Sequence, residues 1–303
     1  MNFELSEEQK MIQQSVERFV QENYDLSDRI KISSENPGYS KDYWNSMAEL
    51  GWLGLAFDEE DGGFGGNQID TLVLMEQFGK GLVLEPFLAN IVLAGGAIKR
   101  GASKALKESI IPKLIEGNLQ LTLAYAEEQS RFDIEDVATA AREDAGNFII
   151  NGKKSMVLNA ESADKVVVVT RTSGSQVDIN GISLFLVDLD SEGIERDNFP
   201  TVDGLRASEI TFKDVKVSAE NLIGEKDKGF SILQEVVNDA ILALSAEAVG
   251  AMEVLYKDTV EYTQQREQFD HPLSDLQVLQ HRMVDMFMDY EQCTSLLLRA
   301  TKE

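Results

Sequence analysis

Glu247 is the residue whose type and surroundings point most clearly to chemistry. It is the only charged side chain between Ala240 and Met252, in the run AILALSAEAVGAM. In a helix, the residues three and four positions away from Glu247 are small or apolar, so its carboxylate would lie on a buried face. Burial raises the pKa of a carboxyl group toward neutrality, as a general base requires. The sequence also allows an exposed carboxylate at the helix edge, or one paired with a neighbouring helix.

Arg266 is a second candidate, in the segment REQF that follows the same helical pattern. A guanidinium group matches the geometry of phosphate oxygens, so Arg266 could bind a phosphate. An arginine near a helix C-terminus also interacts favourably with the helix dipole, and the sequence allows this interpretation equally. Gln277 and His281 follow four residues apart on the next expected helix, a spacing that indicates no function by itself.

The glycine-rich run at residues 62–66 (GGFGG) could in principle bind a phosphate. No strand precedes it, however, and the Lys-Ser/Thr pair of a P-loop is missing, so we interpret it as a connection between helices.

The chain contains one cysteine, Cys293, and two histidines, His271 and His281. They are too few for a disulfide framework or a Cys/His zinc site, and no metal is expected. Any chemistry should come from carboxylates, from a cofactor or from both.

The overall composition restricts the classes of partner. Of 303 residues, 53 are acidic and 28 are basic, so the net charge is −25. A surface of this sign disfavours nucleic acid and anionic membranes; it could attract a basic partner, or it could simply aid solubility. No apolar run is long enough to span a membrane, and the start MNFELSEEQKM lacks the features of a secretory signal. We therefore expect a cytoplasmic protein.

Three stretches of different character must position these side chains. Helical spacing dominates from residue 1 to about 118 and begins with the capping-box pattern Ser6–Gln9. From 119 to 225, β-branched runs separated by turn residues predict a β-sandwich or barrel. From 226 to 303, two long helical patterns flank a break at His271-Pro272. This order predicts an α+β protein with an N-terminal helical domain, a middle β-domain and a C-terminal helical domain, and it argues against a Rossmann fold.

Several motifs, taken in this order, resemble the acyl-CoA dehydrogenase family over all 303 residues. They are LSEEQ, ELGWLGLAFDEEDGGFGG, EGNLQLTLAYAEE, INGKKSMV, GLRASEITFKDVKVSAENLIGE, DKGF, and REQF followed by LQVLQHRMVDM. Within the family, the chain is most similar to the small subunit of pimeloyl-CoA dehydrogenase and to similar subunits of heteromeric acyl-CoA dehydrogenases.

The resemblance implies an oxidoreductase of acyl-CoA catabolism that uses FAD. A carboxylate removes the α-proton of the acyl-CoA, the β-hydrogen passes to the flavin as hydride, and electrons continue to an electron-transfer flavoprotein. It also implies a homo-oligomer or assembly with a sister acyl-CoA dehydrogenase subunit. The family's FAD contacts correspond to Tyr125, Ala126, Glu127, Ser155, Met156, Val157, Arg266, Phe269 and Gln277, of which the last three would serve the neighbouring subunit's FAD.

The chain departs from the family pattern in three places. Residues 128–132 (EQSRF) replace a Pro-x-x-Gly-Ser run, which affects contacts to flavin and acyl chain. Met156 and Leu158 replace a tryptophan and a threonine that cover the flavin. The chain also stops at Glu303, where related subunits continue through further helices, so we expect an incomplete C-terminal domain.

These departures leave the role of the chain open between three interpretations. Some heteromeric members carry their base in an Ala-Glu-x-x-Gly stretch like residues 246–250, which makes Glu247 our candidate, with Asp239 as its competitor. The expected function is α,β-dehydrogenation of an acyl-CoA. The first alternative is a non-catalytic subunit that completes the FAD site of a sister subunit. The second is an oxygen-using flavoenzyme on the same scaffold, since a fold alone does not determine chemistry.

Overall fold

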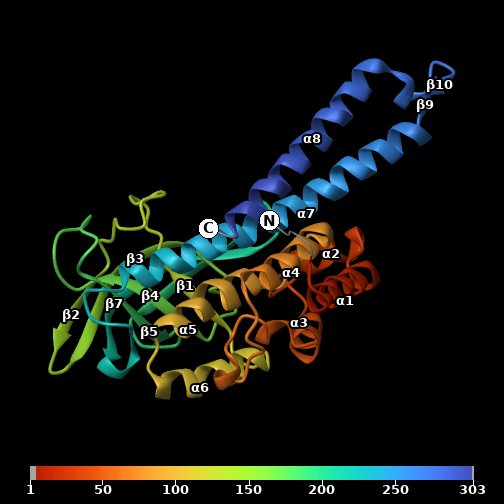
Figure 1. The fold of residues 1–303 in the computed structure, drawn as a ribbon. Helices are drawn as coiled ribbons and strands as arrows, with labels where there is room; N and C mark the ends of the chain where they lie inside the picture. Colours follow the sequence, from red (N-terminus) through yellow and green to blue (C-terminus); the bar gives the residue numbers. More distant parts are fainter. Residues whose placement is uncertain (1–4, 302–303) are drawn as a thin grey trace. The chain divides into compact units, whose positions relative to one another are not determined.

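The computed structural model describes residues 5–301 and divides them into two compact units. The helical unit contains the described parts of 1–28, 68–83 and 241–303, and the sheet unit contains 29–67 and 84–240. Both units are therefore discontinuous in sequence. The order of helices, then strands, then helices is confirmed (Figure 1), whereas the domain boundaries after residues 118 and 225 stay a prediction.

The helical unit is built from α1 (Glu7–Asn23), α4 (Gln68–Gly81), the part of α7 (Phe230–Gln265) from Ile241 onward, and α8 (Gln277–Ala300). The predicted capping box of α1 is present: the Gln9 amide nitrogen donates to Ser6 Oγ over 3.1 Å, and the Ser6 nitrogen donates to Gln9 Oε1 over 3.0 Å. The Gln9 side chain also donates to the buried carboxylate of Asp70 over 3.0 Å. This bond joins α1 to α4.

A tight hairpin connects α7 to α8. Its strands are β9 (Glu267–Gln268) and β10 (His271–Pro272), and the two residues between them, Phe269 and Asp270, have φ values of 58° and 64°. Two consecutive residues with positive φ are typical of a type I′ turn, which suits the twist of a two-residue hairpin. α7 and α8 thus run antiparallel (Figure 1).

The sheet unit contains the remaining helices. They are most of α2 (Leu26–Ser34), α3 (Lys41–Glu49), a π-helix (Leu88–Gly95) that continues as α5 (Gly96–Gly101), and α6 (Lys104–Ile115). Ser40 caps α3 and Ser103 caps α6 by accepting bonds from main-chain nitrogens. The GGFGG run lies between the short turn Glu59–Asp61 and α4, and its main-chain nitrogens donate to carbonyls of residues 54–59. It is a connecting loop, as predicted.

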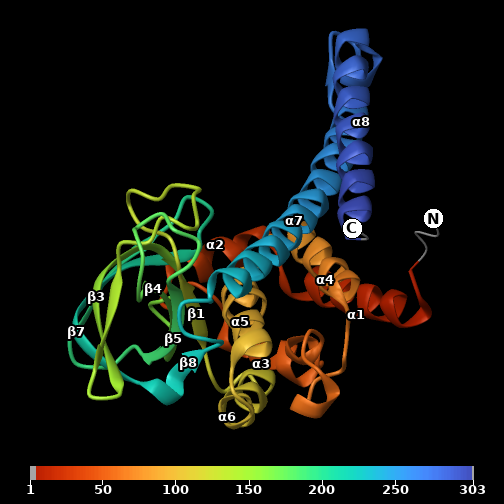
Figure 2. The ribbon, with the colours of Figure 1, turned by 60° about the vertical axis from the view of Figure 1, so that its left-hand side comes forward.

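The strands form one eight-stranded sheet in the order β6-β7-β3-β2-β4-β5-β8, with β1 paired in parallel to β4 (Figure 2). Their bounds are β1 Leu121–Ala124, β2 Ala140–Asp144, β3 Asn147–Leu158, β4 Lys165–Arg171, β5 Ile182–Asp188, β6 Ile194–Pro200, β7 Arg206–Ser218 and β8 Leu222–Ile223. Strands β2 to β5 and β7 bury one common apolar core that includes Phe148, Phe185 and Phe212.

Several elements were not expected from the sequence, among them α2 and β6. No residue of α2 is buried, and β6 is an edge strand that exposes most of its polar sequence IERDNFP. Neither segment shows the apolar periodicity that marks a helix or strand with a buried face. No helix among the described residues is long and apolar enough to cross a membrane.

Candidate functional site

Two of the predicted flavin-contacting segments lie side by side in the sheet unit. The Ser155 nitrogen donates to the Ala126 carbonyl over 2.9 Å, and Lys154 Nζ donates to the Tyr125 carbonyl over 3.2 Å. The end of β1 and the end of β3 are therefore joined directly, although about thirty residues separate them in sequence. The structure thus brings the predicted residues 125–127 and 155–157 together.

A buried ion pair holds these segments in place. Lys154 Nζ lies 2.7 Å from Glu127 Oε1, and the two side chains are 0% and 3% exposed. The Glu127 carboxylate also accepts from the main-chain nitrogens of Ala138 and Thr139 over 2.9 and 3.0 Å, and from Gln129 Nε2 over 2.8 Å. Such complete satisfaction by hydrogen bonds is what a buried charge requires.

The electrostatics of this pair exclude Glu127 as a base. Burial acts to raise the pKa of Glu127, but the charge and hydrogen bond of Lys154, helped by Gln129 and Thr139, lower it to about 2. Burial lowers the pKa of Lys154 to about 8, against the attraction of Glu127. Both groups are ionised at pH 7. A carboxylate held this strongly in its ionised form is a poor proton acceptor near neutral pH, so Glu127 acts as an anchor.

Met156 is presented by a β-bulge. Lys154 pairs with Ile210 and Val157 pairs with Ser208, so β3 holds one residue more than β7 across this step. Met156 has φ 52° and is 53% exposed. Val157 is instead buried in the core of the sheet, so only its main chain could contact a cofactor.

The loop at residues 128–132, whose sequence departs from the family pattern, has two unusual features. Arg131 adopts φ 49° where the family has glycine, and Phe132 is 97% exposed. The loop is anchored at Ser130, whose Oγ accepts from the Glu127 nitrogen and donates to the Glu127 carbonyl, both over 3.0 Å. An exposed aromatic ring and a cation therefore stand where the resemblance places a small Gly-Ser pair.

Glu247 lies in the helical unit, half-buried on α7. Ala243, Ala246 and Val249 form the buried face of this part of the helix, and Glu247 lies at the edge of that face rather than in its centre. Its main-chain carbonyl contacts Gly79 of α4. The neighbouring backbone is therefore held closely, whereas the carboxylate remains partly accessible.

Asp239, the competing candidate base, lies in an ion pair. Its carboxylate, 29% exposed, pairs with the Arg100 guanidinium, which also binds Glu235 over 2.9 Å. A base that must first release an arginine is less suited to accept a proton. The contact with Arg100 therefore counts against Asp239.

Arg266, Phe269 and Gln277 cluster around the α7–α8 hairpin and are all exposed. The Leu273 nitrogen donates to the Arg266 carbonyl over 2.8 Å, which closes the hairpin at its base. Within residues 5–301, the Arg266 guanidinium forms no ion pair. Its charge is thus available for an anionic ligand.

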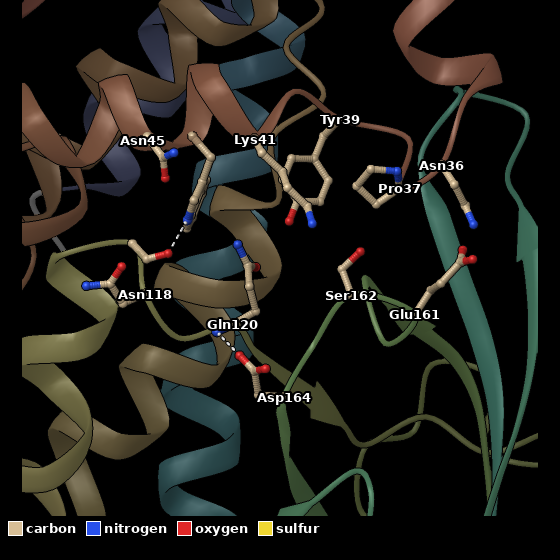
Figure 3. Close-up of a pocket in the computed structure, with 12 residues that line it drawn as sticks. Asn36, Pro37, Tyr39, Lys41, Asn45, Asn118, Gln120, Glu161, Ser162 and Asp164 are labelled. Atoms are coloured by element: carbon tan, nitrogen blue, oxygen red, sulfur yellow. Dashed lines mark hydrogen bonds between the residues drawn. The ribbon is translucent and has the colours of Figure 1, made fainter.

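A polar depression of about 610 Å³ in the sheet unit was not anticipated from the sequence (Figure 3). The Gln120 nitrogen donates to Asp164 there over 2.8 Å, and Trp44 Nε1 donates to the Gly117 carbonyl over 3.2 Å. The walls are mostly amides and charged groups, including Asn36, Lys41, Asn45, Asn118, Gln120, Glu161 and Asp164. Such a lining does not suit an acyl chain, which requires apolar walls.

Two other groups were missed at the sequence level. Glu85 is 6% exposed, and its position in the apolar run LVLEPFLANIVLAGG is a signal that could have found it. Lys154 carries no such signal, because nothing in INGKKSMV indicates which of its two lysines is buried. Among the described residues, no group of three or more His, Cys, Asp or Glu side chains could hold a metal ion.

Comparison with known proteins identifies the family. Models of the acyl-CoA dehydrogenase N-terminal, middle and C-terminal domains match residues 6–118, 122–215 and 227–303. The chain belongs to the acyl-CoA dehydrogenase family, and the predicted fold class is confirmed.

Individual relatives cover nearly the whole chain. The probable acyl-CoA dehydrogenase YngJ of Bacillus subtilis is 28% identical over 99% of this chain and 80% of its own length. The caffeyl-CoA reductase-Etf complex subunit CarC of Acetobacterium woodii is 27% identical over 97% of this chain and 79% of its own length. The solved FAD complex of PigA is 27% identical, with a TM-score of 0.91, over 99% of this chain and 80% of its own.

FAD is the cofactor of this family, and the residues of this chain fit it. The exposed thioether of Met156 offers an apolar surface for a flat ring, and the exposed guanidinium of Arg266 offers donors for a diphosphate. Phe269, 84% exposed, adds a second apolar surface. Leu158 has no hydroxyl, so its side chain offers no hydrogen bond to a cofactor.

Proposed function

We propose that the chain catalyses α,β-dehydrogenation of an acyl-CoA thioester with Glu247 as the base. The observation that carries the assignment is the position of Glu247 as the only acid between Ala240 and Met252, half-buried and held by its main chain. Its carboxylate would accept the α-proton, and the α,β C=C bond forms as the β-hydrogen departs. When bound, FAD supplies the acceptor of that hydride.

The other residues bind and orient. Tyr125, Ala126 and Ser155 would provide main-chain contacts to FAD in the sheet unit, and Met156 would cover its ring. Arg266, Phe269 and Gln277 would bind the FAD of a neighbouring subunit. The Glu127–Lys154 pair keeps the strand ends in place without transferring a proton, because both groups stay ionised at neutral pH.

We further propose an electron-transfer flavoprotein as the electron acceptor and a sister subunit or a second copy as the partner. The name of the CarC relative, a subunit of an Etf complex, supports the first proposal. The resemblance to the pimeloyl-CoA dehydrogenase small subunit supports the second, and it suggests a substrate that is bulky or polar at its far end. A turnover panel of octanoyl-CoA, pimeloyl-CoA and a steroid side-chain CoA tests this; fastest turnover of octanoyl-CoA contradicts it.

A non-catalytic role in a heteromer is the second candidate function. The observation that favours it is the loop at residues 128–132, where Arg131 and the exposed Phe132 replace a Gly-Ser pair. In that case, the chain would support a sister subunit's FAD and would turn over no substrate of its own.

Comparison of Glu247→Gln with Asp239→Asn in the assembled, FAD-loaded protein distinguishes these functions. Removal of a positioned base costs about 10²–10⁴ in rate. We expect Glu247→Gln to retain FAD and fold while flavin reduction by acyl-CoA falls by that factor, and Asp239→Asn to reduce flavin at a rate near wild type. A wild-type rate in Glu247→Gln would exclude the assignment and support the non-catalytic subunit.

A further inference from the structure

Two glycines bring the main chains of α4 and α7 into direct contact in the helical unit. A Cβ atom on Gly79 would lie 1.9 Å from the main-chain oxygen of Glu247, and a Cβ atom on Gly250 would lie 1.9 Å from the main-chain oxygen of Glu76. Figures 1 and 2 show the two helices alongside each other. The contact is reciprocal: each helix presents one glycine to one carbonyl of the other.

The residue on α7 whose carbonyl contacts Gly79 is the proposed base itself. Glycine within a helix costs about 0.5–1 kcal/mol relative to alanine, and both helices bear this cost at the same crossing. No other residue type permits the observed approach, because any side chain would overlap a main-chain oxygen. The crossing therefore determines how far the backbone at Glu247 lies from α4.

An ion-pair network next to the glycines keeps the two helices in register. Lys80, which follows Gly79, lies 2.8 Å from Glu253 Oε2 on α7 and 3.5 Å from Glu76 Oε1 on its own helix. Lys257 pairs with the other oxygen of Glu253. Lys80 and Glu253 are 22% and 15% exposed, so solvent screens their contact only in part. α7 is thus held at its main chain and again one to two turns further on.

We infer that Gly79 and Gly250 are positioning residues for the Glu247 carboxylate. By fixing the main chain of α7 against α4, they set the depth from which the Glu247 side chain reaches the α-carbon of the substrate. This inference rests on the proposed function of Glu247. A displacement of about 1 Å at a reacting group can reduce a rate by about 10²-fold. A Cβ atom at either glycine should therefore slow removal of the α-proton by Glu247.

The test measures exchange of the α-hydrogen of acyl-CoA with deuterated solvent, together with acyl-CoA affinity and thermal unfolding, in the assembled protein. We expect Gly79→Ala and Gly250→Ala to reduce the exchange rate by roughly 10- to 100-fold, with affinity changed much less. Gly81→Ala is the matched control on α4, because a Cβ atom there meets the Val20 side chain of α1 and not α7. It should lower the unfolding temperature but leave exchange near wild type.

Lys80→Met provides a second variant that adds no bulk at the crossing, should the alanine variants fail to fold. It releases the ion pair to Glu253 and should slow exchange without loss of acyl-CoA affinity. Wild-type exchange in a folded glycine variant overturns the inference. If both glycine variants fail to fold, wild-type exchange in Lys80→Met overturns it instead. An equal loss of exchange in Gly81→Ala overturns it as well. Persistent exchange in Glu247→Gln overturns the proposed function instead, so the two failures are distinguishable.

Discussion

Glu127 and Glu247 are held by opposite means in the two units of the molecule. In the sheet unit, the Glu127 carboxylate is enclosed by Lys154 and by donors from Gln129, Ala138 and Thr139. In the helical unit, contact with Gly79 restrains the main chain of Glu247 while its side chain stays half-buried. The first arrangement stabilises the charge of the Glu127 carboxylate, and the second fixes the position of the main chain at Glu247.

This difference explains why burial alone does not identify a catalytic carboxylate. Glu127 is the more buried of the two, but its many donors lower its pKa to about 2. A general base needs a carboxylate that can gain a proton during the reaction, which a fully satisfied ion pair resists. For Glu247, contact of the main chain with Gly79 defines the position of the residue, and the side chain stays half-buried.

The largest effect on stability should come from breaking the pair in the sheet unit. Lys154→Met leaves the Glu127 carboxylate buried without its counter-charge, which typically costs about 3–5 kcal/mol of unfolding free energy. Chemical denaturation measures this change. The double variant Lys154→Met/Glu127→Gln removes both charges and should recover much of the loss. A single variant as stable as wild type would show that the pair is not the anchor of β1 and β3.

A third carboxylate, Glu85, sharpens the comparison because it is buried without a counter-charge. Its Oε1 accepts from the Ser40 nitrogen over 3.1 Å, while Oε2 has no hydrogen-bond partner among residues 5–301. Burial raises the pKa of Glu85 to about 7, although its hydrogen bonds from the main chain act to lower it. Glu85 therefore titrates in the range where Glu127 does not.

The sign of the resulting pH dependence follows from linkage. Below pH 4.5, Glu85 is protonated in both the folded and the unfolded chain; between pH 4.5 and about 7, the unfolded chain ionises first. This carboxyl group should therefore reduce stability by about 3 kcal/mol as the pH rises through that window. In Glu85→Gln, this fall should be absent, measured as the difference in unfolding free energy from wild type at several pH values. A difference that does not vary with pH contradicts the prediction.

Features with a local pattern could be predicted from the sequence. The capping box at Ser6, the GGFGG loop and the long helices followed from spacing within one segment, and the structure confirms them. The Glu127–Lys154 pair could not be predicted, because the pairing of β1 with β4 and of β3 with its neighbours brings these residues together across 27 positions.

In the helical unit, too, contacts between segments that are distant in sequence could not be predicted. Periodicity predicted α4 and α7, but it did not indicate that Gly79 and Gly250 face each other, since each glycine alone looks like a tolerated defect in a helix. The roles of Glu247, Arg266, Phe269 and Gln277 stay predictions, because they concern a cofactor and a substrate and not the packing of this chain.

The smallest effect should come from the ends of helices, where a serine cap can be compared in each unit. Ser6 caps α1 of the helical unit in a reciprocal box with Gln9, whereas Ser40 caps α3 of the sheet unit through a single bond from the Tyr43 nitrogen over 3.2 Å. Loss of a serine cap typically costs about 1 kcal/mol. Ser6→Ala leaves the Gln9 nitrogen without its acceptor, and it loosens the helix that holds Gln9 against Asp70 of α4.

Both cap variants act on the end of a helix and not on the proposed reaction. Their stability changes therefore provide a scale for the larger changes expected above. We expect Ser6→Ala to lower the unfolding free energy by about 1 kcal/mol, and Ser40→Ala to lower it by somewhat less, because its cap has no reciprocal bond. Calorimetry of both variants beside wild type measures the difference. Flavin reduction should stay near wild type in each, since neither serine touches Glu247 or the glycine crossing. A larger cost at Ser40 would contradict the expected order and would indicate that the bond from its main-chain nitrogen to Glu85 depends on the cap.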